Sequence, residues 1–429
     1  MIPTTPEPDR HSHNPLVRYF KLLGPGLVTG ASDDDPSGIT TYSVAGASLG
    51  YGMLWTAIAT FPLMAAVQLI CARIGLVTGR GLAGAVRHHY PRPFLYAACL
   101  ILLAANIFNI AADLAGMAES AKMLTGVPAF VWVPLFGVAI LVVTVYASYA
   151  TLARWLKWLT GVLFAYVAAA FLSKPDWGAA LAASVVPSFR WDPVFVATLV
   201  GVLGTTISPY LFFWQASQEV EEEKALGRRT SAQRRGATDH ELADARLDVN
   251  TGMFFSNLVM YFIILTSAST LHRAGIQEIE TAREAAEALR PLAGDGAYFL
   301  FALALIGTGF LAVPVLAGSA SFAVAELFGW RSGLDLSPRR GRRFYLVFAY
   351  AMFCGMLLDL VQTSPIRMLL LAAILNGLLA PPLLVLVMLV SNNRNIMGER
   401  TNGPWLNLLG WTATVLMTVA AVAFFVTSM

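Results

Sequence analysis

The chain has 429 residues, of which 57% are hydrophobic and only 13% are charged. Soluble domains carry roughly 25% charged residues, and a soluble protein of this length could not bury so much apolar surface in one or two cores. The net charge is only +3 and the basic residues lie between apolar runs, which argues against a nucleic-acid partner. The composition predicts a polytopic membrane protein.

Apolar runs bounded by charge, proline or glycine mark the expected membrane spans. Each spanning helix needs about 20 apolar residues, so the chain has room for eleven spans and short loops. We therefore expect an all-α fold with a single transmembrane domain, residues 1–429. Whether residues 150–158 extend one helix or join two stays open. The expected spans are 22–43, 53–76, 93–117, 128–147, 153–173, 194–216, 249–270, 297–326, 343–362, 366–391 and 405–427.

The basic residues gather on one side of this arrangement. With the N-terminus in the cytoplasm, 22 of the 29 lysines and arginines fall in cytoplasmic segments. Positive residues are retained on the cytoplasmic side of a membrane, so the bias supports both the span count and the orientation. An odd number of spans then places the C-terminus outside. The lipid bilayer is an expected partner, and a monomer is the simplest assembly.

Three consecutive aspartates interrupt the first expected span. Asp33, Asp34 and Asp35 are followed by Pro36 and, two residues later, by Gly38. Ionisable groups at membrane depth are costly and usually functional, and proline and glycine favour a break in the helix. The pattern predicts a cation site near the midplane, built from carboxylates and freed carbonyl oxygens. The alternative is a polar loop, or aspartates that are simply protonated.

The sixth expected span carries a similar interruption. Between Gly204 and Tyr210, a proline at position 209 stands among small polar residues that include Thr205 and Ser208. Paired interruptions at matching places in two halves indicate a transport site. A kink at Pro209 without any role in binding is the alternative.

The two interruptions divide the chain into two similar parts. Five spans, residues 22–173, form the expected first repeat, and five more, residues 194–391, form the second. Because five is odd, the second repeat is inverted relative to the first. Residues 405–427 add one further helix.

The third expected span contains two polar residues on one face. Asn109 and Asp113 are four positions apart, so they lie on the same side of a helix. They are candidates for a solvent or proton path, and a satisfied hydrogen bond within the membrane is the alternative. Asn376 is a weaker candidate for the same cavity. Glu219, near the inner end of the sixth span, is expected to face the cytoplasm.

Several short motifs are spread along the chain from Gly24 onward. Together they make the chain resemble the Nramp divalent-metal transporters. The resemblance implies the LeuT-type inverted-repeat fold with broken helices 1 and 6, alternating-access transport of a divalent metal ion, no enzyme activity and no cofactor. We expect the plasma (inner) membrane of a bacterium. The motifs are Gly24-Pro25-Gly26-Leu27, Asp35-Pro36-Ser37-Gly38, Gly50-Tyr51-Gly52 before Leu54-Trp55, Leu63-Met64-Ala65, Ala72-Arg73-Ile74-Gly75-Leu76-Val77-Thr78-Gly79, Ala112-Asp113-Leu114-Ala115 and Met397-Gly398-Glu399.

The chain departs from the family at positions that bind the metal. The family has Asp-Pro-Gly-Asn in the first span, with the Asp and Asn as ligands; here Asp35 is kept and Gly38 replaces the Asn. The family has Met-Pro-His in the sixth span, with the Met sulfur as a ligand. Ser208 and Tyr210 stand at the Met and His positions, and the family's carbonyl ligand would come from Thr205.

These departures change the expected chemistry. A thioether helps select transition metals, whereas Mg²⁺ and Ca²⁺ prefer oxygen. With Ser208 in place of the Met, and Asp33 and Asp34 beside Asp35, the expected site is all-oxygen. The small residues Gly38 and Ser208 would leave room for a partly hydrated ion, as in the Nramp-related magnesium transporters. We expect Mg²⁺ or Mn²⁺ ahead of iron.

Proton coupling is expected to be weak or absent. The resemblance associates two positions with the family's proton route: the His, which is Tyr210 here, and an acidic residue three after Asp113, which is Gly116 here. Two other functions stay open. A LeuT-fold carrier of an amino acid or other small organic solute is one, although three carboxylates would repel such a substrate. An intramembrane aspartyl hydrolase would pair Asp35 with Asp113 around a shared proton.

Overall fold

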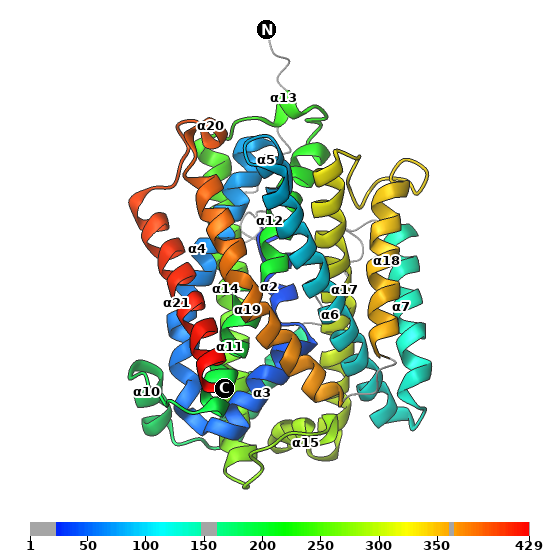
Figure 1. The fold of residues 1–429 in the computed structure, drawn as a ribbon. Coiled ribbons are helices and arrows are strands. Elements are labelled where there is room, and N and C mark those ends of the chain that lie inside the picture. Colours follow the sequence, from blue (N-terminus) through cyan, green and yellow to red (C-terminus); the bar gives the residue numbers. More distant parts are fainter. Residues whose placement is uncertain (1–22, 147–160, 360–363, 429) are drawn as a thin grey trace, which may run out of the picture.

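The protein is a bundle of long helices in a computed structural model (Figure 1). All regular secondary structure in the described part of the chain is helical. The structure describes residues 23–146, 161–359 and 364–428. The expected joint between the fourth and fifth spans, at residues 150–158, lies outside them.

Each expected span coincides with a helix in this part of the chain. Eight helical segments there are long and apolar enough to cross a membrane, and one of them, Pro36–Thr78, covers parts of the first two expected spans. Two further spans match the shorter α9 (Phe164–Leu172) and α18 (Arg342–Asp359), which begins with two arginines. The other long helices are α4 (Leu54–Thr78), α6 (Arg92–Thr125), α7 (Ala129–Tyr146), α14 (Asp239–Ser267), α17 (Ala297–Phe328), α19 (Pro365–Ser391) and α21 (Pro404–Ser428).

Short helices mark the two ends of the bundle. We call the end with α5 (Leu82–Arg87), α13 (Ser231–Arg234) and α20 (Arg394–Met397) the α13 end. The opposite end, the α15 end, holds α10 (Trp177–Val185) and α15 (Ala282–Ala286). Figure 1 shows α7 and α18 on one flank and α21 on the other, so the first and sixth spans lie between them.

Both predicted interruptions are real breaks. The first span consists of α2 (Pro25–Asp33) and α3 (Pro36–Leu49), and the sixth consists of α11 (Pro193–Thr206) and α12 (Pro209–Ala225). In each case the second helix begins with proline at its first position, because the missing N–H costs nothing there and the ring fixes a helical φ angle. The preceding residue is extended, as proline requires.

Glycines let the broken helices approach their neighbours closely. A Cβ atom on Gly30 of α2 would overlap the backbone of Gly252 on α14. A Cβ on Gly204 of α11 would overlap the backbone of Ala373 and Gly377 on α19. Small residues at such crossings are typical of helix packing in membranes, where close van der Waals contact drives association. The breaks are therefore held by α14 on one side and α19 on the other.

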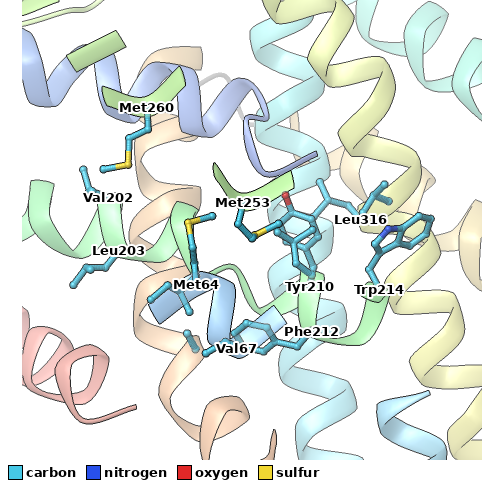
Figure 2. Close-up of a cluster of buried hydrophobic side chains, with 14 of the residues drawn as sticks. Met64, Val67, Val202, Leu203, Tyr210, Phe212, Trp214, Met253, Met260 and Leu316 are labelled. Atoms are coloured by element: carbon cyan, nitrogen blue, oxygen red, sulfur yellow. The ribbon is translucent and has the colours of Figure 1, made fainter. Parts of the chain in front are cut away.

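The apolar core surrounds α12 and contains several methionines. Figure 2 shows Tyr210 and Trp214 with Met64, Met253 and Met260, all buried. These sulfur atoms belong to side chains of the hydrophobic core cluster. The breaks themselves, residues 33–38 and 204–210, contain no methionine or cysteine.

Candidate functional site

Asp35 caps the start of α3 and reaches the second broken span. Its Oδ1 accepts hydrogen bonds from the backbone N–H of Gly38 and the hydroxyl of Ser37, each at 2.7 Å. The hydroxyl of Tyr210, in the first turn of α12, donates to the Ser32 carbonyl at 2.9 Å and lies 3.5 Å from Asp35 Oδ2. Because Asp35 is only 1% exposed, this contact joins the two breaks in the protein interior.

The other two aspartates face a different helix. The hydroxyl of Ser256, on α14, lies 2.8 Å from Asp33 Oδ2 and 3.3 Å from Asp34 Oδ1. Asp33 is the last residue of α2, and Asp35 is extended and caps α3, so the chain changes direction between them and their carboxylates contact different neighbours. Asp33 Oδ1 is buried without a hydrogen-bond partner. No group of three or more His, Cys, Asp or Glu residues in the described part of the chain is arranged to hold a metal ion.

Oxygen atoms of three residues surround the position of Gly38. A Cβ atom placed there would lie 3.0 Å from Thr205 Oγ1, 3.2 Å from the Asp33 carbonyl oxygen and 3.4 Å from Asp35 Oδ1. These oxygens come from both broken spans. The space that a larger side chain would fill is therefore bounded by oxygen atoms.

Ser208 closes the end of α11. Its hydroxyl lies 3.0 Å from the Gly204 carbonyl and 2.8 Å from the Thr205 carbonyl, to which it donates. The last carbonyls of a helix lack partners within the helix, and a nearby hydroxyl satisfies them. The Ser208 oxygen keeps its lone pairs, so it can still accept a hydrogen bond or bind a cation.

Asp113 lies near the first break with its carboxylate unsatisfied. It is fully buried on α6, and neither of its carboxylate oxygens has a hydrogen-bond partner. The backbone N–H of Ser37 and the carboxylate of Asp35, both at the first break, are near enough to interact with it electrostatically. The candidates Asp33, Asp34, Asp35 and Asp113 are thus all buried, and none forms an ion pair with a basic side chain within the described residues.

Asn109 has a different environment. Its amide nitrogen donates to Asn376 Oδ1 at 2.9 Å and to the Ala105 carbonyl at 2.8 Å, and Asn376 Nδ2 returns a bond to Asn109 Oδ1 at 3.0 Å. The two amides form a reciprocal pair that joins α6 to α19. This is the satisfied intramembrane hydrogen bond that the sequence left open as the alternative.

The expectation that Glu219 faces the cytoplasm is wrong. Glu219 is 4% exposed, because α12 continues to Ala225 and keeps this residue inside the bundle. Its carboxylate accepts a hydrogen bond from Gln215 at 2.8 Å, and Gln215 accepts one from Thr29 of α2 at 2.5 Å. The four-residue spacing of Gln215 and Glu219 was a usable signal for a shared face. Ser256 gave no signal, since nothing in the sequence relates it to aspartates that lie more than 220 residues away.

Comparison with known proteins identifies related families and structures. A sequence profile described as natural resistance-associated macrophage protein-like (Nramp) matches residues 26–427. A divalent metal cation transporter MntH of Pectobacterium carotovorum subsp. carotovorum (strain PC1) is 28% identical over 407 residues, which are 93% of this chain and 92% of that protein.

Solved structures share the fold. The Eremococcus coleocola manganese transporter, in complex with an aromatic bis-isothiourea substituted compound, has a TM-score of 0.75 at 17% identity, covering 98% of this chain and 89% of that one. Mhp1, a nucleobase-cation-symport-1 family transporter, has a TM-score of 0.56 at 16% identity, covering 95% and 93%.

These likenesses confirm the all-helical, polytopic LeuT-type fold, and the chain is an integral membrane protein. The Nramp relatives are transporters, so the expectation that the chain is not an enzyme is also confirmed. The alternative of an intramembrane aspartyl hydrolase is therefore wrong. Because the profile covers nearly the whole sequence, the chain belongs to the Nramp family.

Proposed function

We propose that this protein transports a divalent metal cation by alternating access, with the cation bound between the two broken helices. The observation that carries the proposal is the set of four buried aspartates, Asp33, Asp34, Asp35 and Asp113, without a basic partner among the described residues. A buried carboxylate is costly unless a cation or a proton compensates it. A transported cation would supply that compensation while it is bound.

The proposed ligands are oxygen atoms from both breaks. Asp35 is the principal ligand, since it is the aspartate in contact with both broken spans. Thr205 and Ser208 would contribute neutral oxygens, and Gly38 would leave room for water on the ion. Asp33 and Asp34 would add negative charge to the site. They would act either as direct ligands or at a distance, while bonded to the hydroxyl of Ser256.

The ligand set favours Mg²⁺ or Mn²⁺ over softer metals. Hard divalent cations prefer oxygen ligands, and Mg²⁺ keeps several of its waters when it binds. The methionines of Figure 2 are packed in the apolar core, and the break residues themselves supply no sulfur. This chemistry resembles that of the Nramp-related magnesium transporters. A relative and a structural neighbour named as divalent metal and manganese transporters support the wider class of substrate.

We infer that proton coupling is weak or absent. Tyr210 stands where the family has a titrating imidazole, and a phenol with an ordinary pKa of about 10 does not exchange protons readily at neutral pH. Gly116 faces the apolar side chain of Leu369, so no acid is available there. Asp113 is the remaining candidate for a proton or solvent path.

The proposed setting is the plasma membrane of a bacterium, with a monomer as the transporting unit. The α13 end would face the cytoplasm, because the basic residues gather there. The N-terminus would then lie inside and the C-terminus outside. Residues 1–429 would form one transporter domain, in which 22–173 and 194–391 are inverted repeats and 405–427 is an added helix.

Uptake into proteoliposomes tests this function. Vesicles that contain the purified protein, a metal-sensitive dye and a pH dye are exposed to Mn²⁺ or Mg²⁺. We expect metal uptake with little internal acidification, and no uptake by Asp35→Ala. Acidification in step with metal uptake would contradict weak coupling. Uptake of an amino acid instead of a metal would favour the organic-solute carrier.

A further inference from the structure

A groove with an apolar wall lies between α4, α14 and α21, on the flank of the bundle that α21 forms (Figure 1). It has a volume of about 400 Å³, a size typical of sites for small molecules. No residue of either break lines it. We call it the α4–α21 groove; its apolar wall includes Phe61, Pro62, Ala65, Ala66, Leu69 and Leu409.

The groove has the depth of one membrane leaflet. Each of its three helices adjoins a short helix of the α13 end: α5 follows α4, α13 precedes α14, and α20 precedes α21. Arg73 and Arg246 therefore line the groove at that end, together with Trp405, which is 75% exposed in the first turn of α21. Phe61 lies twelve residues before Arg73 on α4, which is about 18 Å along a helix. The hydrocarbon of one leaflet is about 15 Å thick, and tryptophan favours the boundary between hydrocarbon and headgroups.

The two arginines of the groove have no carboxylate partner in the described part of the chain. Arg73 Nη2 donates to the carbonyls of Arg400 and Thr401, at 2.9 and 3.2 Å, which holds the guanidinium in place and leaves Nη1 unused. Arg246 is exposed, and Asp239, at the start of the same helix, bonds to Arg400 instead. No acidic side chain among the described residues lines the groove. The groove therefore combines an apolar wall with a positive charge at headgroup level.

We propose that the α4–α21 groove binds one anionic phospholipid from the leaflet at the α13 end. The phosphate lies between Arg73 and Arg246, and one acyl chain follows the wall from Leu69 to Phe61. Guanidinium groups bind phosphate through charge-assisted hydrogen bonds, and basic pockets between membrane helices bind anionic headgroups. The apolar wall alone would accept any lipid, whereas the two guanidiniums favour a lipid with net negative charge. This site does not depend on which solute the protein transports.

Native mass spectrometry of the purified full-length protein in detergent tests this site. We expect the wild type to retain one dioleoylphosphatidylglycerol more tightly than dioleoylphosphatidylcholine, which has the same acyl chains. Arg73→Gln/Arg246→Gln should weaken phosphatidylglycerol binding about 30-fold, the factor expected from two basic contacts with an anionic headgroup. Arg339→Gln/Arg340→Gln removes the same charge from exposed positions before α18, on the opposite flank, and should bind as the wild type does. Unchanged binding in the first variant, or equal retention of the two lipids by the wild type, would overturn the proposal.

Two measurements on the wild-type protein need no variant to fold. Glycerophosphoglycerol is the same headgroup without acyl chains, so it should not displace phosphatidylglycerol at equal concentration. Displacement would show a site for a free phosphorylated solute and overturn the lipid. A structure determined in phosphatidylglycerol nanodiscs should show a headgroup between Arg73 and Arg246 and a chain beside Phe61. A segment of protein in the groove, or a groove without lipid, would also overturn the proposal.

Discussion

The two broken spans have the same backbone design but different electrostatics. Each begins its second helix with a proline after an extended residue. The first break carries three buried carboxylates, while the second offers the neutral oxygens of Thr205 and Ser208, whose hydroxyl already bonds to helix carbonyls. In the site that we propose, this difference would divide the roles: the first break would supply the charge that attracts a cation, and the second would supply ligands that set which cation fits.

This division has a physical basis in the helix ends. The second helix of each break directs backbone N–H groups toward the break, and these favour negative charge. In the first break Asp35 supplies that charge and accepts the Gly38 N–H. In the second break Ser208 makes no side-chain bond to the start of α12 and instead donates back to α11. Side chains of the second break can therefore be replaced without leaving a buried charge unpaired.

The largest effect should come from neutralising Asp35. Asp35→Asn keeps an oxygen that can accept the Gly38 N–H, so the α3 cap survives while the charge is lost. We expect Mn²⁺ affinity to fall about 100-fold, since a few kcal/mol of charge attraction disappear from a dry site. Calorimetry measures this loss, and the thermal unfolding midpoint serves as the folding control. If Asp35→Asn binds Mn²⁺ with the affinity of the wild type, the charge of the first break does not attract the cation.

Gly38→Asn should change the selectivity between cations, because the larger side chain reduces the space for water on the ion. The new Cβ would lie 3.0 Å from Thr205 Oγ1 and occupy the space between the oxygens. The ion would then have to lose water, which Mg²⁺ does reluctantly. We expect Mg²⁺ uptake to fall about tenfold relative to Mn²⁺ uptake, a difference of about 1.4 kcal/mol. Gly38→Ala is the matched control, because it adds the Cβ without a ligand. If the uptake of Mg²⁺ and of Mn²⁺ falls equally, the proposal that the bound ion keeps part of its water is contradicted.

Ser208→Met should shift the selectivity between cations, because it replaces an oxygen ligand with a sulfur ligand. A thioether is soft, so Mn²⁺ and Cd²⁺ should gain over Mg²⁺ by about fivefold, or ~1 kcal/mol. Competition between the ions for uptake into proteoliposomes measures this ratio. Ser208→Ala removes the oxygen without adding sulfur and should weaken all the ions together. If the methionine and alanine variants behave alike, the second break does not determine selectivity.

The sequence predicted the breaks but not the directions of their side chains. Pro36 and Pro209 act locally, so the positions of the breaks follow from the chain itself. The contacts of Asp33 and Asp34 depend on Ser256, which lies more than 220 residues away in the sequence. The position of Glu219 depends on how far α12 continues and on its packing against α2. Such long-range contacts are set by tertiary packing, which periodicity does not encode.

The smallest effect should come from the Asn109–Asn376 pair, which lies outside both breaks. Interhelical hydrogen bonds in membranes contribute about 0.6 kcal/mol on average, so Asn109→Ala and Asn376→Ala should each lower the unfolding midpoint slightly and leave Mn²⁺ affinity within about twofold. In a double-mutant cycle the two changes should be less than additive, because either one breaks the same reciprocal bond. A large loss of uptake in Asn109→Ala at unchanged stability would instead place Asn109 on the solvent path and show that the transport machinery extends beyond the two broken helices.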